Sequence, residues 1–120
     1  MEMLLGGKGV EPHFRVWLEE DGEPVFGEGV YQLLLGVDRL GSINQAAKSL
    51  AMSYRQAWGH IRETERRLGV RLLECKVGGE AGGGAVLTAA GREWLERYRR
   101  FQAEVGEAVA RAFRRHFGEQ

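Results

Sequence analysis

The sequence is poor in cysteine and has no excess of either charge. Its 120 residues include one cysteine, Cys75, which excludes an intrachain disulfide and favours a reducing compartment. The 17 basic and 17 acidic residues cancel, which argues against a chain that binds nucleic acid. No apolar run approaches the roughly 18 residues of a membrane span, and residues 1–10 lack the pattern of a signal peptide. These absences predict a cytoplasmic protein that does not enter a membrane.

Patterns typical of catalysis and of metal binding are also missing. His13, His60 and His116 are far apart in the sequence, and none lies at a zinc-site spacing from Cys75. The glycine-rich stretch at residues 78–84 lacks the Lys-Ser/Thr or Rossmann spacing that a phosphate-binding loop requires. We therefore expect no enzymatic activity, no metal site and no evident cofactor.

The two charges are distributed unevenly along the chain. Residues 1–41 contain three basic and eight acidic groups, whereas residues 42–100 contain eleven basic and six acidic groups. The net charges of these two stretches are therefore −5 and +5. This separation predicts a phosphate-facing surface on one side only, despite the neutral total.

Residues 41–68 contain two start signals for helices. Both are Ser-x-x-Gln capping boxes, Ser42 with Gln45 and Ser53 with Gln56, in which each side chain binds the other residue's backbone amide. The first helix has one apolar stripe, and residues 51–52 remain for a tight turn. The stripe is Ile43, Ala46, Ala47 and Leu50. This pattern predicts a helix-turn-helix, although helical bundles that never bind nucleic acid can share it.

The second helix, expected from Tyr54 to about Leu68, has an apolar side and a cationic side. Ala57, Ile61, Thr64 and Leu68 form the inward row, flanked by Trp58. Helix-turn-helix proteins read base edges with the start of this helix and bind phosphates around it. Arginine can bind guanine and glutamine can bind adenine in bidentate fashion, so Arg55 and Gln56 are the predicted base contacts. The full predicted DNA-binding set is Ser53, Tyr54, Arg55, Gln56, Gly59, Arg62, Arg66 and, from the following hairpin, Lys76.

Two hairpins and a support helix flank this pair. The alternation of residues 13–19, the turn Asp21-Gly22 and the short return at residues 24–26 predict an N-terminal β-hairpin. Trp17 on its outer face is either covered by a neighbouring element or lies in a subunit interface. The helical spacing from Val30 to Leu40 predicts the support helix. After the second helix, two short apolar strands around the glycine-rich loop predict the β-hairpin of a winged helix, with Arg71 and Lys76 as its charges.

A long helix is expected after Thr88, ending near Phe117. Its apolar residues are spaced 4, 3, 4, 3 and 4 apart, as in a heptad seam. At 1.5 Å per residue the helix is about 45 Å long, more than so small a domain can cover. We therefore predict a homodimer through the seam, the alternative being that the C-terminal half folds back on its own domain or frays. The seam residues are Trp94, Tyr98, Phe101, Val105, Ala108 and Ala112.

These elements predict a mainly α (α+β) fold, a winged helix-turn-helix with an N-terminal β-hairpin and a long C-terminal dimerisation helix. The predicted domain is single and covers residues 1–120. Its parts are the N-terminal hairpin (11–27), the three-helix core (29–68), the wing (69–88) and the dimerisation helix (89–117).

Several stretches resemble known families of regulators. GSINQAAKSLAMS, RRLGVRLLE and LTAAG resemble the winged helix-turn-helix of LysR-type regulators. SYRQAW, GGEAGGGAVLT and FGEGVYQLL are similar, more specifically, to the DNA-binding domain of the ModE family of molybdate-responsive transcriptional regulators. The resemblance covers about residues 13–100 and implies a homodimer that binds double-stranded DNA and regulates genes of molybdenum uptake or of molybdoenzymes.

The resemblance does not carry over a molybdate site. Full-length members of the ModE family bind molybdate in a C-terminal pair of small β domains, which have no counterpart in residues 1–120. A molybdate cofactor would therefore rest on analogy alone. The alternative function is a dimerising interaction module or adaptor that pairs with a separate sensor protein, which the zero net charge favours.

Overall fold

The structure is a computed structural model that describes residues 8–76 and 84–118. The chain divides into two compact units, of which one comprises residues 17–98 and the other joins the residues before 17 to those after 98. Helix α5 (Ala89–Phe117) contributes to both units. A helix of 29 residues is longer than the three-helix core can cover, which explains why its second half belongs to a separate unit.

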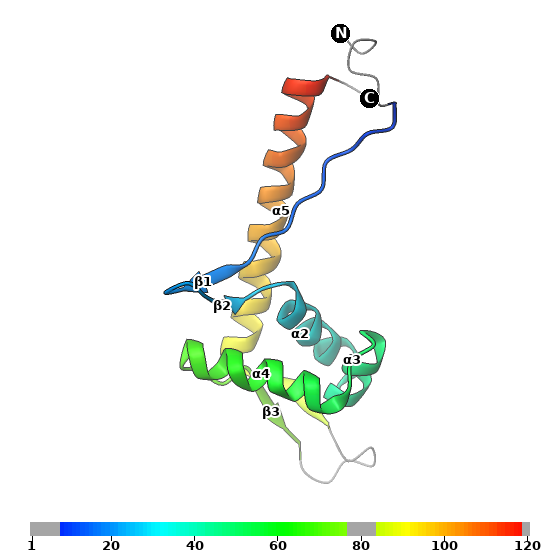
Figure 1. Ribbon diagram of the computed structural model, residues 1–120. Helices are drawn as coiled ribbons and strands as arrows, with labels where there is room; N and C mark the ends of the chain where they lie inside the picture. Colours follow the sequence, from blue (N-terminus) through cyan, green and yellow to red (C-terminus); the bar gives the residue numbers. More distant parts are fainter. Residues whose placement is uncertain (1–7, 77–83, 119–120) are drawn as a thin grey trace. The chain divides into compact units, whose positions relative to one another are not determined.

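Three helices form the core of the unit at residues 17–98 (Figure 1). They are α2 (Glu28–Leu40), α3 (Ile43–Ser49) and α4 (Tyr54–Leu68). Leu33, Leu34, Ile43 and Ile61 are fully buried where these helices meet. Helices α2 and α3 can pack closely because Gly36 has no Cβ atom. A Cβ atom built there would lie only 2.7 Å from the Cβ atom of Ala46. The predicted mainly α class and the three-helix core are confirmed.

The predicted ends of α2 and α4 are confirmed, whereas the capping box predicted at the start of α3 is only half formed among the described residues. Gly41 and Gly69 end α2 and α4 in the left-handed conformation, with φ of 75° and 73°. At the start of α4 the capping box is complete, because Ser53 Oγ accepts from Gln56 N while Gln56 Oε1 accepts from Ser53 N. At the start of α3 Ser42 Oγ accepts the corresponding backbone amide, at 3.2 Å. Local sequence signals therefore fix where the helix-turn-helix begins and ends.

The N-terminal hairpin is shorter than the alternation of residues 13–19 predicts. Its strands are β1 (Leu18–Glu20) and β2 (Glu23–Phe26), joined by a turn with positive φ at Asp21 and Gly22. The expectation of a strand from His13 is wrong. The return strand β2 has only four residues and ends at Phe26, which is opposite Leu18, the first residue of β1.

The second hairpin follows α4, as the winged-helix prediction requires. Strands β3 (Leu73–Cys75) and β4 (Ala85–Leu87) are antiparallel, with Leu73 opposite Leu87. The end of this hairpin next to the glycine-rich loop is joined to the helix-turn-helix, because Ala85 N donates to Gly41 O at 3.0 Å and Ser42 bridges to Gly84. The glycine-rich tip, predicted at residues 78–84, lies outside the described residues except for Gly84.

The first turns of α5 complete the core of this unit. Thr88 Oγ1 accepts from Gly91 N at 2.9 Å, so the predicted cap of the long helix is confirmed. The ring of Trp94 stacks on Phe26, with centroids 5.0 Å apart, and Tyr98 packs against both Phe26 and Tyr31. This aromatic cluster joins α5 to the hairpin and to α2.

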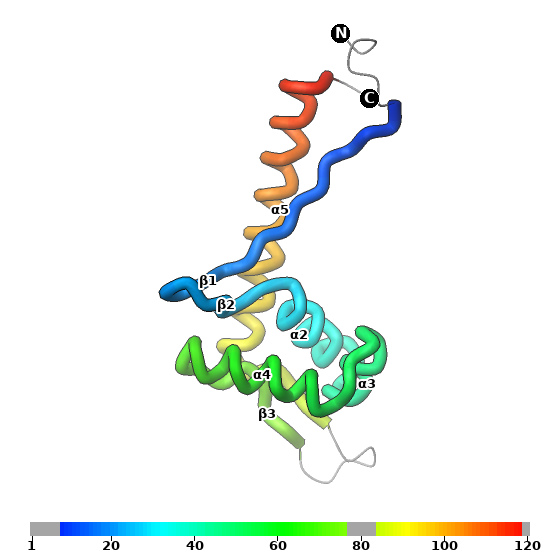
Figure 2. The backbone as a smooth tube through the Cα atoms, viewed as in Figure 1, coloured from blue at the N-terminus to red at the C-terminus, as the bar shows by residue number. Residues whose placement is uncertain are grey.

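In the other unit an extended N-terminal segment runs beside the second half of α5 (Figure 2). The Phe14 ring packs beside Gly106 and lies 3.4 Å from the place where a Cβ atom of Gly106 would be, an ordinary contact distance. Phe101 and Phe117 remain 41% and 50% exposed. No helix among residues 8–76 and 84–118 is long and apolar enough to cross a membrane.

Candidate nucleic-acid interface

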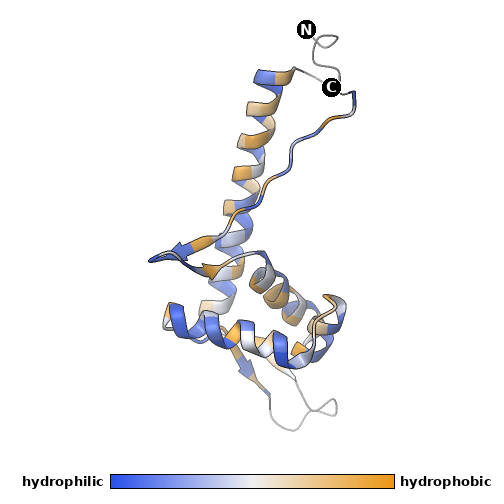
Figure 3. Ribbon diagram, viewed as in Figure 1, coloured by the Kyte–Doolittle hydropathy of each residue, from blue (hydrophilic) through white to orange (hydrophobic). Residues whose placement is uncertain are grey.

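The outward face of α4 gathers four of the predicted DNA-binding positions. Arg55, Gly59, Arg62 and Arg66 are separated by 4, 3 and 4 residues, so they lie on one side of the helix, and all are exposed. Ala57 and Ile61 on the opposite side are fully buried. The hydropathy colouring in Figure 3 shows α4 as largely hydrophilic. The predicted orientation of this helix, with its cations directed to solvent, is confirmed.

The start of α4 presents its polar groups to solvent. Arg55 is exposed and makes no ion pair with another residue in the described part of the chain. Gln56 is exposed, but its Oε1 atom accepts from Ser53 N at 3.0 Å in the capping box. A bidentate contact with adenine uses both the oxygen and the nitrogen of the amide. In this conformation Gln56 offers its Nε2 donor, whereas Arg55 offers its whole guanidinium.

A pair of aromatic rings, Tyr54 and Trp58, lies beside Arg62 in the middle of the helix. Tyr54 meets the ring of Trp58 edge-on, with centroids 6.4 Å apart. The guanidinium carbon of Arg62 lies 4.5 Å from the centroid of the Trp58 ring, within the range of a cation–π interaction. Trp58, expected only to flank the inward row, therefore links the buried side of α4 to a cation on its outer face.

Arg66 carries an ion pair near the end of the helix. Its Nη2 atom donates to Glu63 Oε2 at 2.6 Å, and Arg67 Nε donates to the same oxygen at 2.7 Å. The hydrogen bond from Arg66, together with the charges of Arg66 and Arg67, lowers the pKa of Glu63, and the same bond raises the pKa of Arg66. Arg66 is thus oriented along α4, and a phosphate would compete with Glu63 for it.

Glu65 is a functional candidate that the sequence pattern did not single out. Its side chain is only 6% exposed, although the residue is charged. Glu65 Oε2 accepts from Leu72 N at 2.8 Å and from Leu73 N at 3.3 Å. Its place four residues after the inward-facing Ile61 was the available signal, because a carboxylate at the edge of a buried row must find donors nearby.

Lys76 and the predicted dimerisation residues lie outside this face. Lys76 is exposed at the end of β3, and its backbone nitrogen donates to Gly84 O at 2.7 Å. Trp94 and Tyr98 already pack within their own unit, and Tyr98 is 2% exposed. The other four dimerisation residues, Phe101, Val105, Ala108 and Ala112, belong to the unit that contains the second half of α5. Within the described ranges no group of three or more His, Cys, Asp or Glu side chains could hold a metal ion.

Several curated proteins similar to this chain are named for molybdenum or for transcriptional regulation. The molybdenum-pterin-binding protein MopB of Rhodobacter capsulatus is 36% identical over 95 residues, which are 79% of this chain and 35% of that protein. The molybdenum transport protein ModE of Azotobacter vinelandii is 37% identical over 81% of this chain and 36% of its own length. The DNA-binding transcriptional dual regulator ModE of Escherichia coli K12 is 41% identical over 55% of this chain and 25% of its own length. The chain therefore spans about a quarter to a third of the length of these relatives.

Solved structures similar to this chain include a LysR family transcriptional regulator and complexes of DNA-binding domains with DNA. The CbnR_DBD–DNA complex has a TM-score of 0.58 and 31% identity, covering 71% of this chain and 93% of that one. CbnR, a LysR family transcriptional regulator, has a TM-score of 0.57 over 72% of this chain and 29% of its own. The BenM_DBD/benA site 1 DNA complex, at 21% identity and a TM-score of 0.57, supports the fold.

The family of bacterial regulatory helix-turn-helix proteins of the lysR type matches residues 30–92, from the support helix through the wing to the start of α5. This stretch is more than half of the chain and contains the whole outward face of α4. The description of the family is that of a regulator, in agreement with the expectation that the chain is not an enzyme. The chain belongs to the lysR family of bacterial regulatory helix-turn-helix proteins.

Proposed function

We propose that this chain is the DNA-binding part of a homodimeric transcriptional regulator of genes for molybdate uptake or molybdoenzymes. The observation that carries the proposal is the outward face of α4, where Arg55, Gly59, Arg62 and Arg66 line one exposed side of a capped helix. Such a face suits the major groove, in which the start of the helix meets base edges and its later cations meet phosphates.

The role of each predicted contact follows from its surroundings. Arg55 is the proposed base contact, because its guanidinium is exposed at the start of α4. Gln56 contributes its Nε2 donor, while its oxygen keeps the cap of the helix. Ser53 and Tyr54 face the phosphates at the helix start, and Lys76 contacts the backbone from the wing. Gly59 allows close approach, since nothing lies within 4 Å of a Cβ atom placed there.

The proposed link to molybdenum rests on the names of the relatives. Proteins named for molybdenum binding, molybdenum transport and transcriptional regulation match this chain at 36–41% identity. Because the chain spans at most 36% of their length, we assign no molybdate site to it. Isothermal titration calorimetry with sodium molybdate is expected to show no binding heat at millimolar concentration, and a saturable heat would contradict this assignment.

The proposed dimer uses the second half of α5. Phe101 is 41% exposed, and Val105, Ala108 and Ala112 continue its heptad spacing. An isologous dimer would present two α4 helices to half-sites about 34 Å apart or a multiple of that distance. Phe101→Glu is expected to shift the mass measured by light scattering toward the monomer, whereas the exposed-site control Glu104→Gln is expected to leave the dimer intact.

A binding titration at two salt concentrations tests the DNA-binding function. A fluorescently labelled duplex from the promoter of a molybdate transporter, and a scrambled duplex of equal length, are titrated with the full chain. We expect tighter binding to the promoter and a steep loss of affinity as salt rises, because each phosphate contact releases a counterion. Absence of binding to both duplexes at low salt would support the adaptor instead.

A further inference from the structure

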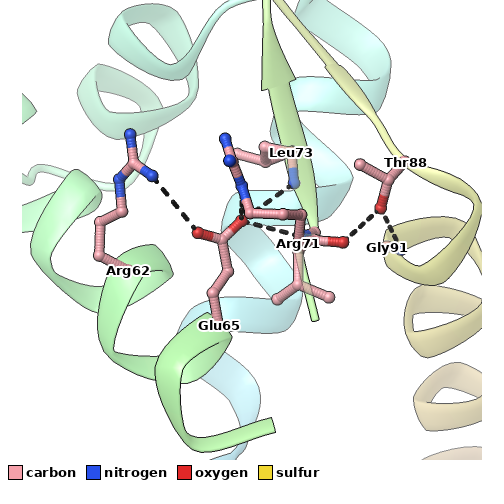
Figure 4. Close-up of polar contacts among 7 residues, drawn as sticks. Arg62, Glu65, Arg71, Leu73, Thr88 and Gly91 are labelled. Atoms are coloured by element: carbon pink, nitrogen blue, oxygen red, sulfur yellow. Dashed lines mark hydrogen bonds and ion pairs between the residues drawn. The ribbon is translucent and has the colours of Figure 1, made fainter. Parts of the chain in front are cut away.

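Two arginines from different elements lie on opposite sides of the buried carboxylate of Glu65. Arg62 Nη1, on α4, is 3.8 Å from Glu65 Oε1, and Arg71 Nε, in the segment that leads into the wing, is 3.7 Å from Glu65 Oε2. Figure 4 shows the two guanidiniums approaching one carboxylate from α4 and from the wing. The side chains of Arg62 and Arg71 are 56% and 62% exposed, whereas that of Glu65 is 6% exposed.

The backbone of the wing segment is fixed at Arg71 and at the two residues that follow it. The Glu65 carboxylate accepts from Leu72 N and Leu73 N, immediately after Arg71. Thr88 Oγ1 donates to Arg71 O at 2.6 Å and accepts from Gly91 N, which ties the same residue to the start of α5. Arg71 therefore extends from a rigid main chain, and its side chain can be held in one place at a smaller entropic cost.

The guanidiniums of Arg62 and Arg71 lie near the Glu65 carboxylate but are not hydrogen-bonded to it. Both contacts are longer than a hydrogen bond, and neither Arg62 nor Arg71 donates a side-chain hydrogen bond within the described parts of the chain. Arg62 also rests on the Trp58 ring, so it is positioned from two directions. An arginine has five N–H donors that match the geometry of phosphate oxygens. Both side chains thus keep donors for an external anion.

The space beside these arginines is a shallow cleft of about 320 Å³. It is lined by Arg62, Glu65, Arg66, Gly69, Val70 and Arg71. This lining carries three arginines and one carboxylate, so the cleft favours an anion. Because Arg62 and Arg66 share the outward face of α4, the anion best placed to enter is a phosphate of the DNA that this face binds.

We propose that the cleft between the end of α4 and the wing binds one phosphodiester of the DNA backbone, and that Glu65 is the positioning residue of this site. The inference rests on the proposed DNA-binding function and adds to it a role for Glu65 and Arg71. Glu65 holds Arg62 and Arg71 at one spacing, so that helix and wing bind the backbone as one unit. The buried carboxylate strengthens binding to DNA, although it is itself repelled by the phosphates.

The substitution Glu65→Gln separates positioning from simple charge. The glutamine oxygen can still accept from Leu72 N and Leu73 N, but the negative charge between the arginines is gone. Charge alone predicts tighter binding to DNA, since the variant is more positive by one unit. The proposal predicts the opposite, a several-fold weaker affinity for a labelled duplex of arbitrary sequence at low salt. Glu74→Gln, at an exposed position of β3, makes the same change of charge as a control and is expected to tighten binding slightly.

A double-mutant cycle tests the shared phosphate directly. Arg62→Ala and Arg71→Ala are each expected to weaken binding several-fold and to reduce the salt slope by about one unit. Together they should cost less than the product of the two single losses, because both contact the same group. In the Glu65→Gln background this coupling should shrink toward zero. Circular dichroism melts show whether each variant is folded.

Two results would overturn the proposal. One is a folded Glu65→Gln variant that binds DNA as tightly as the wild type or more tightly. The other is independent, multiplicative losses for Arg62→Ala and Arg71→Ala in the wild-type background, which decides the matter even if Glu65→Gln fails to fold. If the wild-type chain does not bind duplex DNA at all, the proposed function fails instead, and the two failures are distinguishable.

Discussion

The two ends of helix α4 differ in what occupies their polar side chains. At the start, Arg55 forms no ion pair among the described residues, and Gln56 keeps one free donor group. At the end, Glu63 binds Arg66 and Arg67, while Glu65 contacts residues of both α4 and the wing. We call the start of α4, at Arg55 and Gln56, the open end of the helix, and the part from Glu63 to Arg67 the bonded end.

This difference indicates that the two ends of α4 have different roles in binding DNA. Side chains without internal partners can adapt to the edges of different bases, so the start of α4 suits sequence recognition. Side chains held by internal contacts present a fixed array of charge, which suits a backbone that is alike in every sequence. If the two ends have different roles, substitutions at each end should differ in their effects on folding and on DNA binding.

Gly91→Ala should disrupt the bonded end alone. A Cβ atom at Gly91 would lie 2.2 Å from Leu72 O, so the backbone that Glu65 binds must shift. We expect a loss of about 3 kcal/mol in the free energy of unfolding, at the upper end of the range for overpacked sites, measured by urea denaturation. Gly106→Ala in the same helix is the control, since its Cβ atom would make an ordinary 3.4 Å contact. Equal stabilities for the two variants would show that the junction is not tightly packed.

Arg55→Ala and Arg66→Ala should separate the two ends by their effects on DNA. Loss of the open-end residue Arg55 is expected to cost about 1–3 kcal/mol on the preferred sequence and to relax the preference. Loss of Arg66 should weaken all sequences alike and flatten the salt slope by about one unit. Competition titrations with matched and scrambled duplexes measure both quantities. Equal and sequence-independent losses of affinity for the two variants would show that the two ends of α4 do not have different roles.

Gly59→Ala should have opposite effects on folding and on binding. Alanine is favoured over glycine by roughly 1 kcal/mol within a helix, and nothing lies within 4 Å of the new Cβ atom. We therefore expect a higher melting temperature by calorimetry. If the backbone at Gly59 approaches the DNA as proposed, affinity should fall in the same variant. An unchanged affinity would remove Gly59 from the interface.

Glu63→Gln should have the smallest effect, and one that depends on pH. The pKa of Glu63 is lowered from its ordinary value of 4.5, chiefly by the hydrogen bond from Arg66, so its ionised form stabilises the folded chain. This contribution is fully present above pH 4.5 and is lost as the pH falls through the lowered pKa. The melting temperatures of wild type and variant should differ slightly at pH 7 and converge in acid. A difference that persists below the lowered pKa would point to another cause.

Much of the fold follows from local signals in the sequence. The Ser-x-x-Gln pair at the start of α4 and the glycines at 41 and 69 set the limits of the helices, because capping and left-handed φ depend on neighbouring residues alone. The outward face of α4 follows from helical spacing in the same way. The spacing of Trp94 and Tyr98 also predicted an apolar face, but it did not show which residues this face contacts.

Which residues a side chain or strand contacts was decided by the packing of segments that are far apart in the sequence. Periodicity cannot tell whether an apolar seam meets its own chain or a second copy. Packing against the core, including the stack on the hairpin residue Phe26, places Trp94 inside this unit. The strand expected from His13 failed for the same reason, since alternation shows a face but supplies no pairing strand.

The sequence by itself determined the limits of α2 and α4 and the cationic face of α4, because these depend on interactions within a few residues. It also determined the family, which rests on the residues themselves over positions 30–92. Only the tertiary structure revealed Glu65 as the link between helix and wing. Its carboxylate is satisfied by amides seven and eight residues away and lies between arginines of two elements, an arrangement that exists only once α4 and β3 have packed together.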